Sequence, residues 1–233
     1  GVMNEGETST HLGLKGIPEL AESLMVARDL NILEYTGGKL HFNCISTSKS
    51  IELISKAKKD GMQVTCDLSS YNLLLDETEL EEFDTRFKTL PPLRSKGTIK
   101  ALIKGIKNGT IDAICSDHSP EDVEEKMKEF DHAAFGIINL QTSFAAANSA
   151  LKKTFTISEI IPLFTSGPAK ALGLNLGLIE EGEKAELTLF LPEEEFTFTK
   201  EMVLSKSKNS PFFNRKLHGK VVGIINGSKV VLN

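Results

Sequence analysis

Residues 111–120 read I-D-A-I-C-S-D-H-S-P, an apolar run followed at once by polar side chains. The apolar part, residues 111–115, predicts a short buried strand. This strand ends in Asp117 and His118, and ligands of parallel α/β folds bind just beyond the carboxyl ends of strands. A carboxylate there can ligate a metal or take a proton from water. Alternatively, Asp117 caps a turn, since Asp before Ser-Pro is good turn chemistry; spacing alone favours neither reading.

The segments before this strand alternate between strand and helix patterns. Residues 40–45 and 63–68 are predicted strands, and apolar residues repeat at helical spacing over about 18–36, 47–59 and 98–107. Glycines follow these helical segments, as expected at helix ends. Such alternation predicts an α/β fold with a parallel sheet and helical crossovers. Two further helices are predicted over about 137–152 and 157–172.

The character of the sequence changes near residue 175. Residues 185–191 and 220–232 are rich in strand-forming residues, and Asn226-Gly227 between Val/Ile runs predicts a tight hairpin. We therefore expect two parts, residues 1–175 and a β-rich module of residues 176–233.

Composition excludes several classes of protein. The chain has 233 residues, 40% hydrophobic and 25% charged, an ordinary globular composition. Its net charge of 27 − 32 = −5 disfavours a nucleic-acid partner. No apolar run is long enough to span a membrane. The three widely spaced cysteines fit a reducing cytoplasm better than a disulfide framework.

The cysteines differ in their predicted roles. Cys44 ends the first predicted strand and is a candidate thiolate metal ligand, although a lone strand cysteine is more often a small buried hydrophobic residue. Cys66 and Cys115 lie inside strands, so we expect them to be packing residues.

Several motifs together resemble the dihydroorotases of the amidohydrolase superfamily, in particular the longer bacterial type. Residues 112–120 resemble the family's D-x-I-A-T-D-H-A-P, residues 1–7 resemble G-V-M-N-E-G-E, residues 87–94 resemble F-K-V-N-P-P-L-R, and residues 130–137 resemble F-D-x-A-P-F-G-I. The motifs occur in the family's order and cover nearly the whole chain.

This resemblance implies the C-terminal half of a TIM-type (β/α)8 barrel plus the C-terminal part of a small β-sandwich module. Since such a barrel takes about 250 residues, we expect that roughly half of the intact protein precedes Gly1. The resemblance also implies zinc-assisted hydrolysis or closure of a cyclic amide, from N-carbamoyl-aspartate to dihydroorotate, in cytoplasmic pyrimidine biosynthesis. Asp117 matches the family's catalytic and metal-binding Asp, Cys44 stands at a metal position, and Gly136 stands at a substrate-binding position.

The predicted site also departs from the family pattern. Cys44 replaces the His of H-x-S-T, Tyr71 and Asn72 replace both His residues of T-P-H-H, and Leu90 replaces the Asn of V-N-P-P. Tyr and Asn are poor zinc ligands, so we expect zinc catalysis to be weakened or lost. The alternative is a non-catalytic dihydroorotase-like structural partner of aspartate transcarbamoylase. The family also implies a homo-oligomer and, if the chain is active, a cyclic amide or ureido acid substrate.

Overall fold

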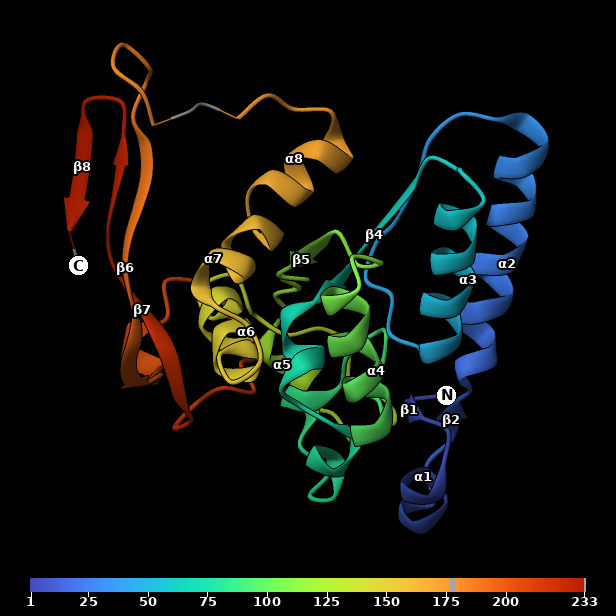
Figure 1. The fold of residues 1–233 in the computed structure, drawn as a ribbon. Helices are drawn as coiled ribbons and strands as arrows, with labels where there is room; N and C mark the ends of the chain where they lie inside the picture. The colour runs from blue at the N-terminus through green and yellow to red at the C-terminus, as the bar shows by residue number, and fades with distance from the viewer. Residues whose placement is uncertain (177–178, 233) are drawn as a thin grey trace.

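Three parallel strands form the centre of the fold (Figure 1), in a computed structural model that describes residues 1–176 and 179–232. The strands are β3 (Leu40–Phe42), β4 (Val64–Ser69) and β5 (Ala113–Cys115), in the order β3-β4-β5. The crossover from β3 to β4 contains α3 (Ser48–Lys59), and the crossover from β4 to β5 contains α4 (Lys96–Lys107). The predicted parallel sheet with helical crossovers is confirmed. The last strand is shorter than predicted, because it begins at Ala113.

Local sequence signals account for where the outer helices begin and end. The helix α2 (Glu19–Thr36) follows Pro18, carries acidic side chains in its first turn and ends at Gly37, whose φ of 70° suits glycine. The Thr47 side chain caps α3 by accepting a hydrogen bond from the Ser50 N–H, and lysines fill the last turn. The helix α2 packs against α3 on the outside of the sheet.

The predicted helices after β5 are shorter and more broken than expected. The segment 137–152 is helical only over α6 (Ser143–Leu151), and 157–172 divides into α7 (Ile157–Ile160), a 3-10 turn (Ile161–Leu163) and α8 (Ser166–Leu172). Pro162 has no N–H with which to continue an α-helical ladder, so the helix is interrupted there. The remaining elements of residues 1–176 are two short parallel strands, two short helices and three 3-10 turns: β1 (Met3–Asn4), α1 (Glu7–Leu12), β2 (Gly16–Ile17), α5 (Val123–Lys126), Ser70–Leu73, Glu77–Leu80 and Thr85–Phe87.

The C-terminal part is an antiparallel sheet of β6 (Glu186–Thr197), β7 (Lys216–Asn226) and β8 (Lys229–Leu232), with a 3-10 turn at Lys200–Met202. The predicted hairpin is confirmed between β7 and β8. Asn226 pairs with Lys229, so the turn itself consists of residues 227 and 228, and Gly227 has a φ of 59°. The expected domain division near residue 175 stays a prediction.

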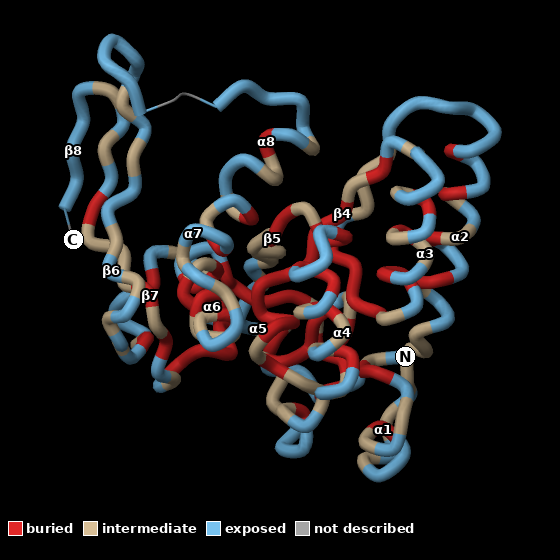
Figure 2. Tube along the Cα trace, viewed as in Figure 1, coloured by how far each residue is buried: buried red, intermediate tan, exposed pale blue. Residues whose placement is uncertain are grey.

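Two hydrophobic clusters fill the interior, which Figure 2 shows as the buried centre around β4 and β5. The first lies between the parallel sheet and its helices and includes Ile54, Leu68 and Leu102. The second includes Tyr71 and Phe212. The first cluster includes residues of β4 and β5, and the second includes Tyr71, which follows β4, so both clusters pack around the ends of these strands. None of the described helices combines the length and apolar character needed to cross a membrane.

Candidate active site at the strand ends

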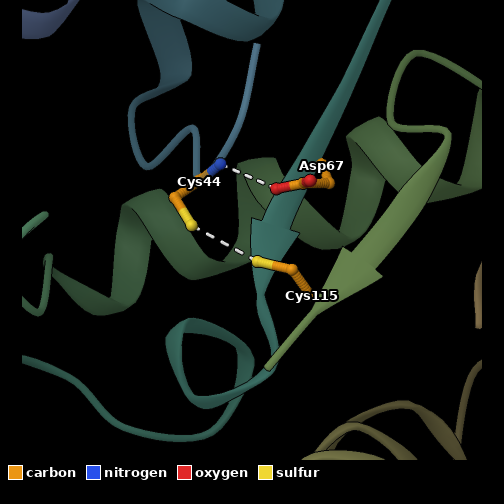
Figure 3. Close-up of side chains that lie close together, drawn as sticks. All are labelled: Cys44, Asp67 and Cys115. Carbon is orange, nitrogen blue, oxygen red and sulfur yellow. Dashed lines mark hydrogen bonds between the residues drawn. The ribbon is translucent and has the colours of Figure 1, made fainter. Parts of the chain in front are cut away.

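Side chains from all three parallel strands meet at the carboxyl end of the sheet (Figure 3). Cys44 comes two residues after β3, Asp67 lies in β4, and Cys115 is the last residue of β5. Their sulfur and carboxylate atoms all lie within 4.8 Å of one another. Within residues 1–176 and 179–232, no other set of three His, Cys, Asp or Glu side chains converges in this way.

The position of the Cys44 sulfur depends on an unusual backbone. Cys44 has a φ of 56°, in the left-handed region of the backbone that residues other than glycine rarely adopt. The Asp67 carboxylate compensates by accepting a hydrogen bond of 2.7 Å from the Cys44 backbone N–H. This contact turns the chain after β3 so that the Cys44 sulfur reaches over β4 and lies 3.3 Å from the Cys115 sulfur.

Asp67 also belongs to a chain of polar contacts toward the other end of β4. The second Asp67 oxygen lies 3.0 Å from His41 Nε2, and His41 Nδ1 lies 2.8 Å from the Thr65 hydroxyl. Asp67 is only 7% exposed, and these contacts satisfy its carboxylate. The sequence places Asp67 at a strand end but indicates no partner for it, and it favours a structural role for His41. The sequence signal for these contacts is the alternation of side chains along a strand, which places Thr65, Asp67 and Ser69 on one face of β4.

Asp117 follows β5 and points to a different set of partners. Its Oδ2 atom accepts hydrogen bonds from the Tyr71 hydroxyl and, at 3.3 Å, from the Ser69 hydroxyl. Burial and then the charge of Asp117 raise the pKa of Tyr71 well above its ordinary value of 10.0. The phenol is therefore protonated at neutral pH and acts as a donor to Asp117.

The structure does not bring the two predicted metal ligands, Cys44 and Asp117, into one three-ligand set. Cys44 meets Cys115 and Asp67, whereas Asp117 is engaged by Tyr71. Cys115, expected only to pack, contacts the Cys44 sulfur. The pKa of the Cys115 thiol is raised by its hydrogen bond with Cys44 and by burial.

Two other residues of the predicted site, Asn72 and His118, are not among the side chains that converge at the strand ends. Asn72 is 2% exposed, and neither atom of its amide group has a hydrogen-bond partner among the described residues. Asn72 thus stands buried next to Tyr71, where the family pattern has its second histidine. The His118 ring accepts hydrogen bonds at Nδ1 from the backbone N–H groups of Asn139 and Leu140, which leaves its proton on Nε2.

Gly136, expected to contact substrate, is enclosed by protein atoms. Its N–H donates to the Lys88 carbonyl, and its own carbonyl accepts from Lys126 Nζ and Asn209 Nδ2, each at 3.0 Å. Its φ of 129° and the proximity of Ser119, 2.8 Å from where a Cβ would lie, require glycine. The substrate-binding role of Gly136 remains a prediction.

Comparison with known proteins agrees with the predicted half-barrel. The sequence pattern of the Amidohydrolase family matches residues 4–231. The chain belongs to the amidohydrolase family. This amidohydrolase chain is 43% identical over 234 residues to a dihydroorotase of Acetivibrio thermocellus, a match that covers 99% of the chain and 55% of that relative.

Solved structures give the same result for the fold. The amidohydrolase chain superimposes with a TM-score of 0.84 on an L-hydantoinase (dihydropyrimidinase) from Arthrobacter aurescens, at 25% identity, over 91% of the chain and 49% of that protein. It matches the inactive dihydroorotase-like domain of a Chaetomium thermophilum CAD-like multifunctional protein with a TM-score of 0.67, at 19% identity, over 88% of the chain and 54% of that protein. The chain thus spans about half the length of the proteins it matches, which agrees with a partial barrel.

The strand-end residues of this amidohydrolase chain fit the family's zinc chemistry poorly. One of the two Asp117 oxygens, Oδ2, already accepts two hydrogen bonds, which leaves Oδ1 as the oxygen that could act as a metal ligand or proton acceptor. A phenol and an amide stand where imidazoles are expected, and they are weaker zinc ligands. This donor set therefore fits zinc poorly, and the metal-binding roles of Cys44 and Asp117 stay predictions.

Proposed function

We propose that the chain is part of a dihydroorotase-family protein of cytoplasmic pyrimidine biosynthesis in which zinc-dependent interconversion of N-carbamoyl-aspartate and dihydroorotate is weakened or lost. The 43% identity to a dihydroorotase supports the family reaction. One observation carries the loss of catalysis: the Tyr71 hydroxyl donates a hydrogen bond to Asp117.

The contact between Tyr71 and Asp117 opposes the expected reaction in two ways. Zinc, when bound, would supply an activated water, and Asp117 would be the residue that accepts its proton and passes it to the leaving nitrogen. Here the phenol donates a hydrogen bond to one of the two Asp117 oxygens, which stabilises the charged carboxylate and makes it a weaker proton acceptor. Zinc held by Cys44 would also receive negative charge from the thiolate, which lowers its power to polarise an amide carbonyl.

The test uses the complete protein. Bound zinc is measured by elemental analysis, and N-carbamoyl-aspartate cyclisation is assayed in the wild type, Asp117→Asn, Tyr71→His and Tyr71→His/Asn72→His variants. We expect little zinc and little turnover in the wild type, with any gain confined to the variants that restore imidazoles. Stoichiometric zinc in the wild type, with turnover that Asp117→Asn abolishes, would show that the proposal is wrong.

A second candidate function is that of a non-catalytic structural partner of aspartate transcarbamoylase. It is supported by the exposed apolar stripe of α2, formed by Leu20, Leu24 and Tyr35, which are 60%, 58% and 92% exposed. These positions lie on one face of the helix, since they are separated by about one and three turns. Exposed apolar patches on a folded protein mark interaction surfaces.

The partner role is tested by size-exclusion chromatography with light scattering on the complete protein, alone and mixed with aspartate transcarbamoylase. We expect a mixed complex that Leu20→Glu/Leu24→Glu disrupts and that Val230→Glu, an exposed residue of β8, leaves intact. If the stripe instead mediates only a homo-oligomer, the α2 variant lowers the mass of the protein alone and no mixed complex forms, which would refute the partner role.

A further inference from the structure

Two thiols, those of Cys44 and Cys115, lie next to each other in the strand-end cluster. The Cys44 and Cys115 sulfurs are 3.3 Å apart, although 71 residues separate them in the chain. A disulfide bond is about 2.05 Å long, so the sulfurs need to approach by only about 1.3 Å. We propose that Cys44 and Cys115 form a reversible intramolecular disulfide, which makes the strand ends an oxidative modification site.

The surroundings hold the two sulfurs toward each other. The hydrogen bond from the Cys44 N–H to Asp67 fixes the left-handed backbone that aims the Cys44 side chain over β4. The Ser69 hydroxyl contacts both sulfurs, at 3.4 Å from Cys44 and 3.9 Å from Cys115. Two thiols held in this way lose little freedom when they join, which favours the bond.

The hydrogen bonds around the cluster favour a sulfur–sulfur bond over a metal site. The third member of the cluster, Asp67, already uses one oxygen for the Cys44 N–H and the other for His41.

The oxidant is a low-molecular-weight disulfide. Cys115 is the more exposed of the two cysteines. Because its contact with Cys44 and its burial raise the pKa of its thiol, exchange proceeds slowly, through the small ionised fraction. This thiolate attacks the small disulfide to give a mixed disulfide and one released thiol. The Cys44 thiolate then attacks the Cys115 sulfur and releases the second small thiol. One protein S–S bond forms, the small S–S bond breaks, and the two electrons and two protons pass to the two released thiols.

The disulfide would join the end of β3 to the end of β5 across β4, two residues before Asp117. A cross-link that closes so long a loop restricts the unfolded chain and stabilises the fold. Oxidation is therefore expected to rigidify the strand ends and raise the thermal midpoint of the protein.

The experiment exposes the reduced, complete protein to hydroxyethyl disulfide, blocks free thiols by alkylation under denaturing conditions, and maps the peptides by mass spectrometry. We expect a linked Cys44–Cys115 peptide, unlinked Cys66, and a thermal midpoint raised by several degrees that dithiothreitol reverses. The matched control Cys66→Ser retains the link, because Cys66 is fully buried elsewhere in the sheet. The Cys115→Ala variant loses both the link and the rise.

Three outcomes would overturn the proposal: Cys44 and Cys115 both remaining alkylatable, a mixed disulfide that stays on Cys115, or zinc bound by both sulfurs that keeps them out of exchange. None of these readouts depends on turnover. The proposal can therefore fail while the proposed function stands, and the reverse also holds.

Discussion

The hydrogen bond from Tyr71 to Asp117 predicts a measurable loss of stability in Tyr71→Phe. The variant removes only the hydroxyl, while the ring stays in the second hydrophobic cluster. A hydrogen bond to a charged acceptor is worth about 1.5–3 kcal/mol. For domains of 150–250 residues, each kcal/mol shifts the thermal midpoint by about 2–4 °C, so we expect a fall of roughly 3–12 °C.

Tyr35→Phe provides a matched control, because Tyr35 is exposed on α2 and its hydroxyl has no such partner among residues 1–176 and 179–232. We expect its thermal midpoint to stay close to that of the wild type. Difference titration of tyrosinate absorbance then compares each variant with the wild type. Because the pKa of Tyr71 is raised, Tyr71→Phe should remove no step near the ordinary phenol pKa of about 10 while the protein is folded.

The raised pKa of Tyr71 also fixes the sign of the alkaline pH dependence. Above a pH of about 10, the unfolded phenol loses its proton while the folded one keeps it, so the free energy of unfolding falls by up to about 1.4 kcal/mol per pH unit. Urea unfolding between about pH 9 and 11 should show this slope in the wild type and in Tyr35→Phe. In Tyr71→Phe, unfolding should release one proton fewer, so the slope should be smaller. A folded Tyr71 that titrates near pH 10, with no change in thermal midpoint for Tyr71→Phe, would refute the reasoning.

Three further predictions concern buried groups around the site. Burial lowers the pKa of Lys126 to about 8 from 10.5, so the free energy of unfolding should rise between these pH values, and urea unfolding of Lys126→Met should lack that rise. Arg94→Lys should lower the free energy of unfolding, measured in urea, by about 2–4 kcal/mol. The guanidinium contacts of Arg94 with Asn4 and Ser46 are buried, and a single ammonium group cannot replace them. An unchanged urea midpoint would contradict this. Gly136→Ala should lower the thermal midpoint, because its Cβ would clash with Ser119 at a φ of 129°, and calorimetry that shows no loss would disprove the clash.

Much of the architecture follows from local sequence signals. Short apolar runs with polar ends predicted the positions of β3, β4 and β5, and Gly and Asn-Gly signals predicted helix ends and the last hairpin. These predictions succeed because strand alternation, helix capping and turn conformation depend on neighbours within a few residues. The extended helix predicted over 157–172 was wrong, because apolar periodicity continues past Pro162 whereas the backbone hydrogen-bond ladder does not.

The sequence by itself therefore determined the family, the order of the parallel strands along the chain and the place of Asp117 at a strand end. Only the tertiary structure decided the partners of these residues. Cys44 meets Cys115 across 71 residues, and Asp117 meets Tyr71 across 46 residues, through turns of the backbone after β3 and β5. Such contacts arise from packing between distant segments, which no local periodicity encodes, and here that packing sets a thiol pair beside a carboxylate that is hydrogen-bonded to a buried phenol.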